Sequence, residues 1–143
     1  MLSATDLPDV NVWLALTVQN HPRHERARRF WHDESADRVA FCRVTMLGFL
    51  RLTTNDRVMS GSPLTVTQAW NAYASLRSAP EVILAHEPAN CEGDFQSVAL
   101  GNNFTPRMWT DGYLASFAIT AGMRLVTFDT DFSRFAGLNL LQL

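Results

Sequence analysis

The segment MWTDGYLASFAITAGMRLVTFDTDFSRF, residues 108–135, decides the fold. It predicts a helix that Thr110 caps and Gly122 stops, followed by a strand over residues 124–128 that ends at Asp129. An apolar helix face that leads through a glycine into a β-prone run is typical of proteins that alternate helices with strands.

The same alternation continues upstream and downstream of this segment. Strands are expected at residues 4–9, 39–44, 81–85 and 138–141, and helices over WLALTV (13–18), after Pro22, after Thr45 as N-cap, and from Thr65 as cap to Arg77. Strands that alternate with helices favour a mostly parallel sheet with helices on both faces. We therefore predict an α/β fold, a three-layer α/β/α sandwich in a single domain over residues 1–143.

Composition excludes several classes of protein. Twelve basic and fourteen acidic residues give a net charge of −2, which argues against a domain whose whole surface grips nucleic acid. The sequence has no apolar run long enough to span a bilayer, and MLSATDLPDV lacks the pattern of a signal peptide. We expect a soluble, cytoplasmic protein. Cys42 and Cys91 have no metal-binding spacing, and we expect both to be reduced and buried.

Three aspartates lie where an α/β protein builds its sites. Asp9 and Asp129 each follow a β-prone run directly, and Asp111 lies in the first turn of the predicted helix. Ligands in open α/β sheets bind beyond the carboxyl ends of the strands, so these carboxylates can converge. The structural alternative is that Asp9 caps a helix and that Asp111 favours the positive end of its helix.

Convergence of the three carboxylates has a chemical consequence. Two carboxylates about 4 Å apart repel by roughly 4 kcal/mol at an effective dielectric near 20, so such a cluster needs a cation. Oxygen ligands favour Mg²⁺ or Mn²⁺, and magnesium held by few carboxylates coordinates substrate phosphate. The pattern points to phosphodiester hydrolysis. We also expect the helix terminus to keep Asp111 ionised, and metal affinity to fall at acid pH.

The chain resembles the PIN domain family, and within it the VapC-type toxins of bacterial toxin-antitoxin pairs. The segments that carry the resemblance are LPDVNVWLAL, HPRHERARRFW, FCRVTMLGFLRLTTN, MWTDGYLASFAITAGMRLVTFDTDFSRF and GLNLLQL. They span nearly the entire chain, in the family's order and at its spacing.

The resemblance implies roles for particular residues. Asp9, Asp111 and Asp129 correspond to metal-binding carboxylates, Thr127 to a hydroxyl that lines the site, and Asn11 to a polar residue that orients the first aspartate. It further implies Mg²⁺- or Mn²⁺-dependent cleavage of RNA to a 5′-phosphate and a 3′-hydroxyl. The partners it implies are a cognate VapB-type antitoxin, which binds through its C-terminal segment, and a second copy of the chain in a homodimer.

One departure from the family concerns a fourth acid. Many PIN nucleases carry a glutamate in the helix after the second strand, whereas TMLGFLRLTT has no acid and places Gly48 near that position. Asp131, two residues beyond Asp129, is the first candidate to compensate. Glu87 and Asp94 are further candidates, in a segment that we interpret as a loop.

Several other residues have ordinary interpretations. His21 and His24 lie three apart, but no third ligand is evident nearby, so a metal site there is not expected. Three of the four tryptophans fall on apolar helical stripes, which favours core packing over stacking on RNA bases. The arginines at 23–29, 43 and 51 are consistent with contacts to RNA phosphates, with antitoxin contacts or with a solvated surface.

Two alternatives to a ribonuclease toxin stay open. The missing glutamate motivates a degenerate PIN module that binds RNA or protein without cleaving. Strand-end aspartates also serve as nucleophiles in Rossmann-like phosphatases and receiver-type domains. The absence of lysine disfavours this second alternative, because such sites usually place a lysine near the phosphoryl group.

Overall fold

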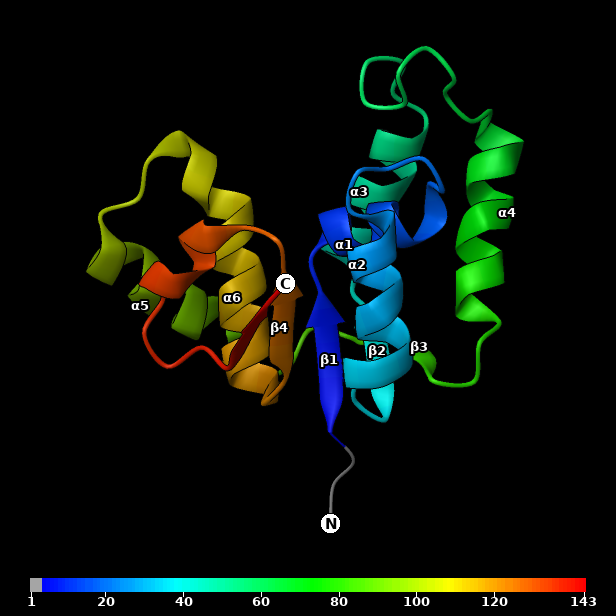
Figure 1. Cartoon of the computed structure of the whole chain (residues 1–143). Helices are drawn as coiled ribbons and strands as arrows, with labels where there is room; N and C mark the ends of the chain where they lie inside the picture. Colours follow the sequence, from blue (N-terminus) through cyan, green and yellow to red (C-terminus); the bar gives the residue numbers. More distant parts are fainter. Residues whose placement is uncertain (1–3) are drawn as a thin grey trace.

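Strands and helices alternate along the chain in the computed structural model, which describes residues 4–143 (Figure 1). The strands are β1 (Thr5–Pro8), β2 (Arg38–Phe41), β3 (Val82–Leu84), β4 (Arg124–Thr127) and β5 (Leu140–Gln142). They form one sheet in the order β3-β2-β1-β4-β5, and every pair is parallel. This confirms the predicted α/β class with a parallel central sheet.

Helices of different lengths connect these strands. They are α1 (Val10–Thr17), α2 (His24–Arg29), α3 (Arg43–Thr53), α4 (Val66–Arg77), α5 (Cys91–Asn102) and α6 (Trp109–Ala121). A π-helical turn (Phe30–Glu34) continues α2, and 3₁₀ turns lie at Pro106–Met108 and Thr130–Arg134.

The strand order reverses between β1 and β4. From β1 the chain builds outward to β2 and β3, and it then returns to the other side of β1 to add β4 and β5. In open parallel sheets, ligands bind at such a reversal, beyond the carboxyl ends of the strands. The fold therefore directs attention to the residues that follow β1 and β4.

Alternate residues along a strand point to opposite faces of the sheet, so each face has its own core. Val39 and Phe41 of β2 pack with Trp13 and Phe49 on one face, where the Trp13 and Phe41 rings stack with their centroids 3.8 Å apart. Ala40, between them in sequence, belongs to the core on the other face. The two-residue period of a strand thus produces the predicted three layers.

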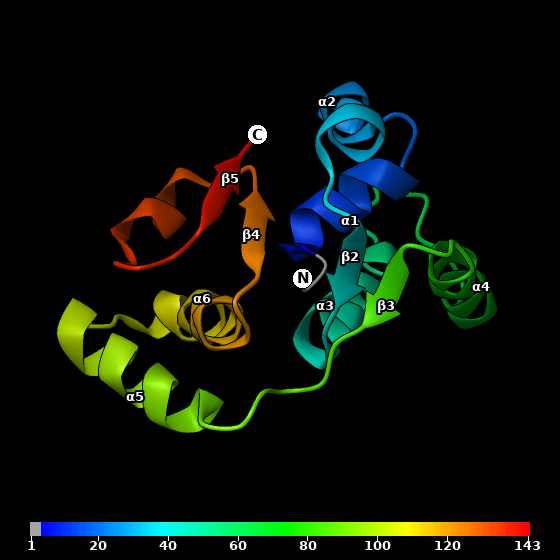
Figure 2. The ribbon, with the colours of Figure 1, turned by 90° about the horizontal axis from the view of Figure 1, so that it is seen from below.

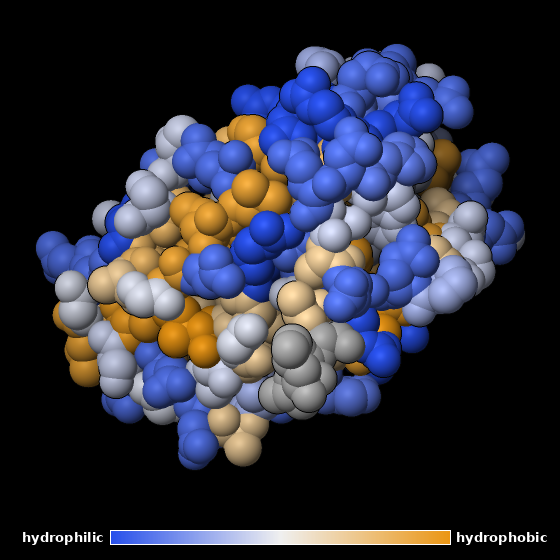
Figure 3. All heavy atoms as spheres, turned by 60° about the horizontal axis from the view of Figure 1, so that its bottom comes forward, coloured by the Kyte–Doolittle hydropathy of each residue, from blue (hydrophilic) through white to orange (hydrophobic). Residues whose placement is uncertain are grey.

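The two outer layers differ in character. Figure 2 shows α1 and α2 on one side of the sheet and α5 and α6 on the other. Hydrophobic residues gather on the half of the surface that carries β4, β5, α5 and α6 (Figure 3). No helix within residues 4–143 is both long enough and apolar enough to cross a membrane.

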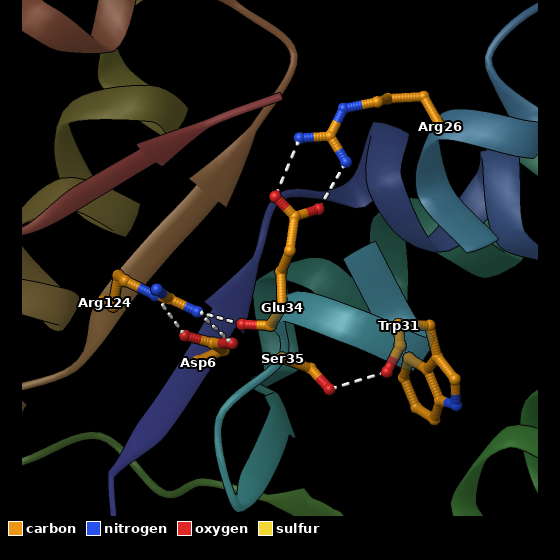
Figure 4. A network of polar contacts seen from close by, with 6 residues as sticks. All are labelled: Asp6, Arg26, Trp31, Glu34, Ser35 and Arg124. Atoms are coloured by element: carbon orange, nitrogen blue, oxygen red, sulfur yellow. Dashed lines mark hydrogen bonds and ion pairs between the residues drawn. The ribbon is translucent and has the colours of Figure 1, made fainter. Parts of the chain in front are cut away.

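A polar network crosses the sheet near the amino ends of β1 and β4 (Figure 4). Asp6 is fully buried and accepts two hydrogen bonds from Arg124, at 2.7 and 2.9 Å, and one from the Ala36 backbone N–H at 2.8 Å. Arg124 also donates to the Glu34 carbonyl, and the Glu34 carboxylate pairs with Arg26 of α2. The network joins two strands to the turn between α2 and β2.

Some predicted helix starts were wrong by a few residues. The helix after β2 starts at Arg43, with Cys42 at its N-cap position. Thr45 lies inside this helix, and its hydroxyl oxygen accepts a hydrogen bond from the Cys42 N–H at 2.9 Å. Thr110 does not cap α6, because a 3₁₀ turn already leads into Trp109. The first helix starts at Val10, immediately after Asp9, rather than near Trp13.

Other boundaries were predicted closely. Thr65 caps α4 through a capping box with Gln68, and this helix ends at Arg77. Gly122 ends α6 with φ +68°, the left-handed conformation that glycine adopts readily. The helix α5, however, occupies a segment that the sequence pattern suggested was a loop.

Candidate metal centre

The acidic site lies where the strand order reverses. Asp9 follows β1 directly, Asp129 comes two residues after β4, and Asp111 lies in the first turn of α6. The charges of Asp9 and Asp129 contribute to raising the pKa of Asp111, so the three carboxylates lie near enough to interact electrostatically. The structure therefore places the three predicted carboxylates in the same region, where the strand order reverses.

Asp9 is held firmly at the centre of the site. Its side chain is only 8 % exposed, and its backbone N–H donates to the Val126 carbonyl at 2.8 Å, which ties β1 to β4. Its Oδ1 accepts from the Val10 N–H at 2.6 Å, so it also caps α1. Burial raises the pKa of Asp9 above its ordinary value, while the bonds from Val10 and Thr127 oppose that rise.

Thr127 links the carboxylate of Asp9 to the backbone of Asp129. Its hydroxyl is fully buried and donates to Asp9 Oδ2 at 3.1 Å, while its oxygen accepts from the Asp129 N–H at 3.0 Å. Asp129 Oδ1 in turn accepts from the Asp131 N–H at 2.8 Å, which starts the 3₁₀ turn. One hydroxyl thus sets the orientation of Asp9 and the position of the Asp129 backbone.

The carboxyl of Asp111 has a strongly raised pKa. Partial burial, together with the charges of Asp9 and Asp129, raises its pKa to about 6, against the opposing charge of Arg134. Desolvation and like charges outweigh the helix dipole, so the pKa of Asp111 is raised rather than lowered, yet at about 6 it leaves the carboxyl mostly ionised at pH 7.

A cavity of about 310 Å³ opens beside these acids on the α6 side. Its lining includes Asp111, Asp129, Asp131 and Arg134. Asp131 is exposed and contacts Arg134, with 3.4 Å between its Oδ1 and an Nη of the arginine. Asp131 therefore borders the same space as two of the three predicted ligands.

The structure separates the other candidate acids from this site. Glu87 accepts a hydrogen bond from the Tyr113 hydroxyl at 2.6 Å, and Asp94 accepts one from Thr120 at 2.7 Å. Both acids thus bind the flank of α6. Gly48 is buried in α3, and a Cβ there would lie 3.0 Å from Val10, so a larger side chain would press on the start of α1.

The histidines near α2 serve local structure. His24 Nδ1 lies 2.7 Å from the Ala15 carbonyl oxygen, and His21 Nδ1 accepts from the Arg23 N–H at 3.0 Å. These bonds are consistent with the expectation that the pair is not a metal site. Of the tryptophans, Trp13 is buried as expected, whereas Trp70 and Trp109 are about half exposed, so core packing was wrong for Trp70.

The carboxylate oxygens of the three aspartates suit a hard divalent cation, although they are not arranged closely enough to coordinate one. Asp9, Asp111 and Asp129 offer only oxygen atoms, and burial together with repulsion from neighbouring carboxylates raises the pKa values of Asp9 and Asp111. Within residues 4–143, no three His, Cys, Asp or Glu side chains stand close enough together to hold an ion as arranged. A bound cation would offset the repulsion among these carboxylates.

Comparison with known proteins identifies this arrangement. The PIN domain model matches residues 7–138. Ribonuclease VapC41 of Mycobacterium tuberculosis is 41% identical over 140 residues, covering 94% of this chain and 95% of the relative. Ribonuclease VapC33 of the same species is 30% identical over 138 residues, covering 92% and 93%.

Solved structures show the same fold at lower identity. VapBC2 from Rickettsia felis, bound to a DNA fragment from its promoter, superposes with a TM-score of 0.71 at 14% identity, covering 97% of this chain and 98% of that chain. Mycobacterium tuberculosis VapC20, a Sarcin-Ricin loop cleaving toxin, gives 0.68 at 19% identity, covering 93% and 98%. The chain thus belongs to the PIN domain family and, within that family, to the VapC group.

Proposed function

We propose that this protein is an endoribonuclease toxin that requires Mg²⁺ or Mn²⁺ and that a cognate VapB-type antitoxin neutralises in the cytoplasm. The observation that carries the proposal is the placement of Asp9, Asp111 and Asp129 at the reversal point of the sheet. The VapC relatives named as ribonucleases support the reaction class, and the VapBC structures support the antitoxin.

Each site residue has a defined task in this proposal. Asp9, Asp111 and Asp129 would hold the ion, which when bound activates a water for attack on phosphorus and neutralises charge on the leaving oxygen. Thr127 keeps one oxygen of Asp9 in a fixed orientation through the 3.1 Å hydrogen bond. Asp131 borders the cavity and is the candidate for a fourth acid.

Cleavage of a structured RNA tests the reaction. We expect cutting that EDTA abolishes and that Asp9→Asn or Asp129→Asn removes. Asp56→Asn, in an exposed loop before α4, is the matched control and leaves cutting intact. Cutting by both site variants at the wild-type rate would refute the assignment.

Binding of the ion is tested separately by calorimetry. Titration of the metal-free protein with Mn²⁺ and with Mg²⁺ gives saturable heat that Asp9→Asn eliminates. An absence of heat together with retained RNA affinity would instead favour a PIN module that binds without cleaving. The acid-free α3 helix, with Gly48 buried against Val10, is the observation behind that second candidate.

We also propose a homodimer formed through the groove between α3 and α6. Its lining includes Val44, Leu47, Phe95 and Trp109, and Leu47 and Trp109 are 58% and 52% exposed. Leu47→Asp is expected to yield monomers in light scattering, whereas Val66→Asp on α4 leaves the dimer unchanged. A monomeric wild-type protein would contradict the proposal.

A further inference from the structure

Asp129 borders two cavities, one on each side of the sheet. The cavity of about 310 Å³ lies on the α6 side and is also lined by Arg107, Asp111 and Arg134. A second cavity, of about 490 Å³, lies at the start of α1 and α2, and its lining includes Asn11, His21, Arg23 and Phe128. The acidic site therefore has an open space on each side.

The α6-side cavity carries two cations beside its acids. The Nε of Arg134 donates to the Asp131 carbonyl at 2.8 Å, and its guanidinium lies 6.0 Å from the centre of the Phe135 ring. These contacts fix the group while leaving other N–H donors for a ligand. Arg107, exposed on the 3₁₀ turn before α6, takes part in none of the ion pairs found within residues 4–143.

The α1-side cavity presents donors and an aromatic face. The guanidinium of Arg23 lies 4.8 Å from the centre of the Phe128 ring, a stacked arrangement that holds a planar cation at the cavity wall. Burial, together with the charges of Arg23 and His24, lowers the pKa of His21. Because Nδ1 accepts from the Arg23 backbone N–H, the neutral imidazole carries its hydrogen on Nε2.

Arg23 and Arg107 line these cavities without an ion pair among the described residues, whereas Arg134 pairs with Asp131 at 3.4 Å. Arg26, Arg28 and Arg124 are paired with Glu34, Glu25 and Asp6. Arg23 has no such ion pair within the described residues, and Asp129 is the only acid lining its cavity. In a protein of net charge −2, cations next to an acidic centre are suited to hold an anionic chain against it.

We propose that the two cavities are subsites for the nucleotides on either side of the bond that is cut, with Arg23 and Phe128 forming one and Arg134 and Arg107 the other. The inference rests on the proposed ribonuclease function. An RNA backbone that passes Asp129 would place a phosphate at each arginine group. The Arg23–Phe128 stack would offer a planar surface to an unpaired base.

Steady-state cleavage and binding of a short, fluorescent, single-stranded RNA of mixed sequence test the subsites. Arg23→Gln is expected to raise KM about tenfold and to leave kcat within about twofold, because it removes a charge-assisted phosphate contact but no metal ligand. In EDTA, the same variant weakens binding by a similar factor and lowers the salt slope by about 0.7.

Matched variants control for charge and for folding. Arg57→Gln removes an equal charge from an exposed loop and should behave as wild type. Arg134→Gln should weaken binding in EDTA, and Arg134→Lys should restore part of it. Equal KM and binding for Arg23→Gln, Arg134→Gln and Arg57→Gln would overturn the proposal, as would loss of antitoxin binding alone in the first two.

The outcomes also separate this inference from the proposed function. If the wild type cuts RNA and the arginine variants match it, the ribonuclease function stands and the subsites are wrong. If the wild type does not cut but the arginine variants lose RNA binding, the two arginine groups bind RNA and the cleavage function is wrong.

Discussion

At the scale of single residues, Asp111 experiences opposing electrostatic effects. The first turn of a helix favours a negative charge, yet partial burial and two neighbouring carboxylates raise the pKa of Asp111 to about 6. Protons therefore compete with a metal ion for this side chain at a higher pH than for an ordinary aspartate. We expect metal affinity to fall as the pH drops through about 6.

The same shift makes a prediction about stability without metal. The unfolded chain holds Asp111 near a pKa of 3.8 and the folded chain near about 6, so the ionised form opposes folding above about pH 6 and not below about pH 4. With a chelator present, Asp111→Asn should raise Tm by a few degrees at about pH 8, and the gain should disappear towards pH 4. A gain that is independent of pH would contradict this explanation.

Thr127 provides a second prediction at this scale. Thr127→Val keeps the shape of the side chain but leaves the Asp129 N–H without its 3.0 Å acceptor, at a cost of roughly 1–3 kcal/mol. The same substitution removes the hydrogen bond to Asp9 Oδ2 that orients this carboxylate, so kcat should fall while RNA binding in EDTA is retained. Thr127→Ser keeps the hydroxyl and should recover most of the kcat. Denaturant unfolding and single-turnover cleavage measure the two effects.

At the scale of elements, local chemistry determines which parts of the fold the sequence reveals. Thr65 and Gln68 form a capping box, and the predicted helix 65–77 matches α4 closely. The helix α5 lacks such a signal: Gly93 and Gly101 lie within it, and its flanking residues Asn90 and Asn103 have left-handed backbones. Packing against α6 stabilises α5, and the sequence of α5 alone does not reveal this contact with a distant segment.

Gly112 provides a prediction for α6. In a helix interior, alanine is normally more stabilising than glycine by about 1 kcal/mol. At Gly112, however, a Cβ would lie 2.2 Å from the ring of Phe104, in the loop before the 3₁₀ turn. Gly112→Ala should therefore destabilise the protein, by about 1–3 kcal/mol in urea unfolding. Gly93→Ala, with no atom near its Cβ, is the control and should be neutral or stabilising.

At the scale of the whole molecule, the sheet order assembles the site. Asp9 and Asp129 are 120 positions apart in sequence and become neighbours because β4 inserts beside β1. The strand-end positions of both residues could be predicted from periodicity and turn signals. The order of the strands could not, and neither could Arg23 on Phe128, since both depend on contacts between distant segments.

The Asp6–Arg124 network gives a prediction at the same scale. Removing the arginine leaves a fully buried carboxylate with only the Ala36 N–H as partner, which should cost about 3–5 kcal/mol. Arg124→Met should therefore lower the unfolding free energy strongly, measured by urea denaturation. The double variant Asp6→Leu/Arg124→Met should lose less than the single one. A larger loss in the double variant would show that the ion pair itself is the stabilising element.

The two buried cysteines can report how often one layer of the fold opens. Cys42 follows β2, Cys91 starts α5, and each is only about 1% exposed within one core. Burial raises the pKa of the Cys91 thiol to about 11, so almost none of it is thiolate at neutral pH. Alkylating reagents therefore reach Cys91 only when α5 leaves the sheet, and the labelling rate reports how often that layer opens.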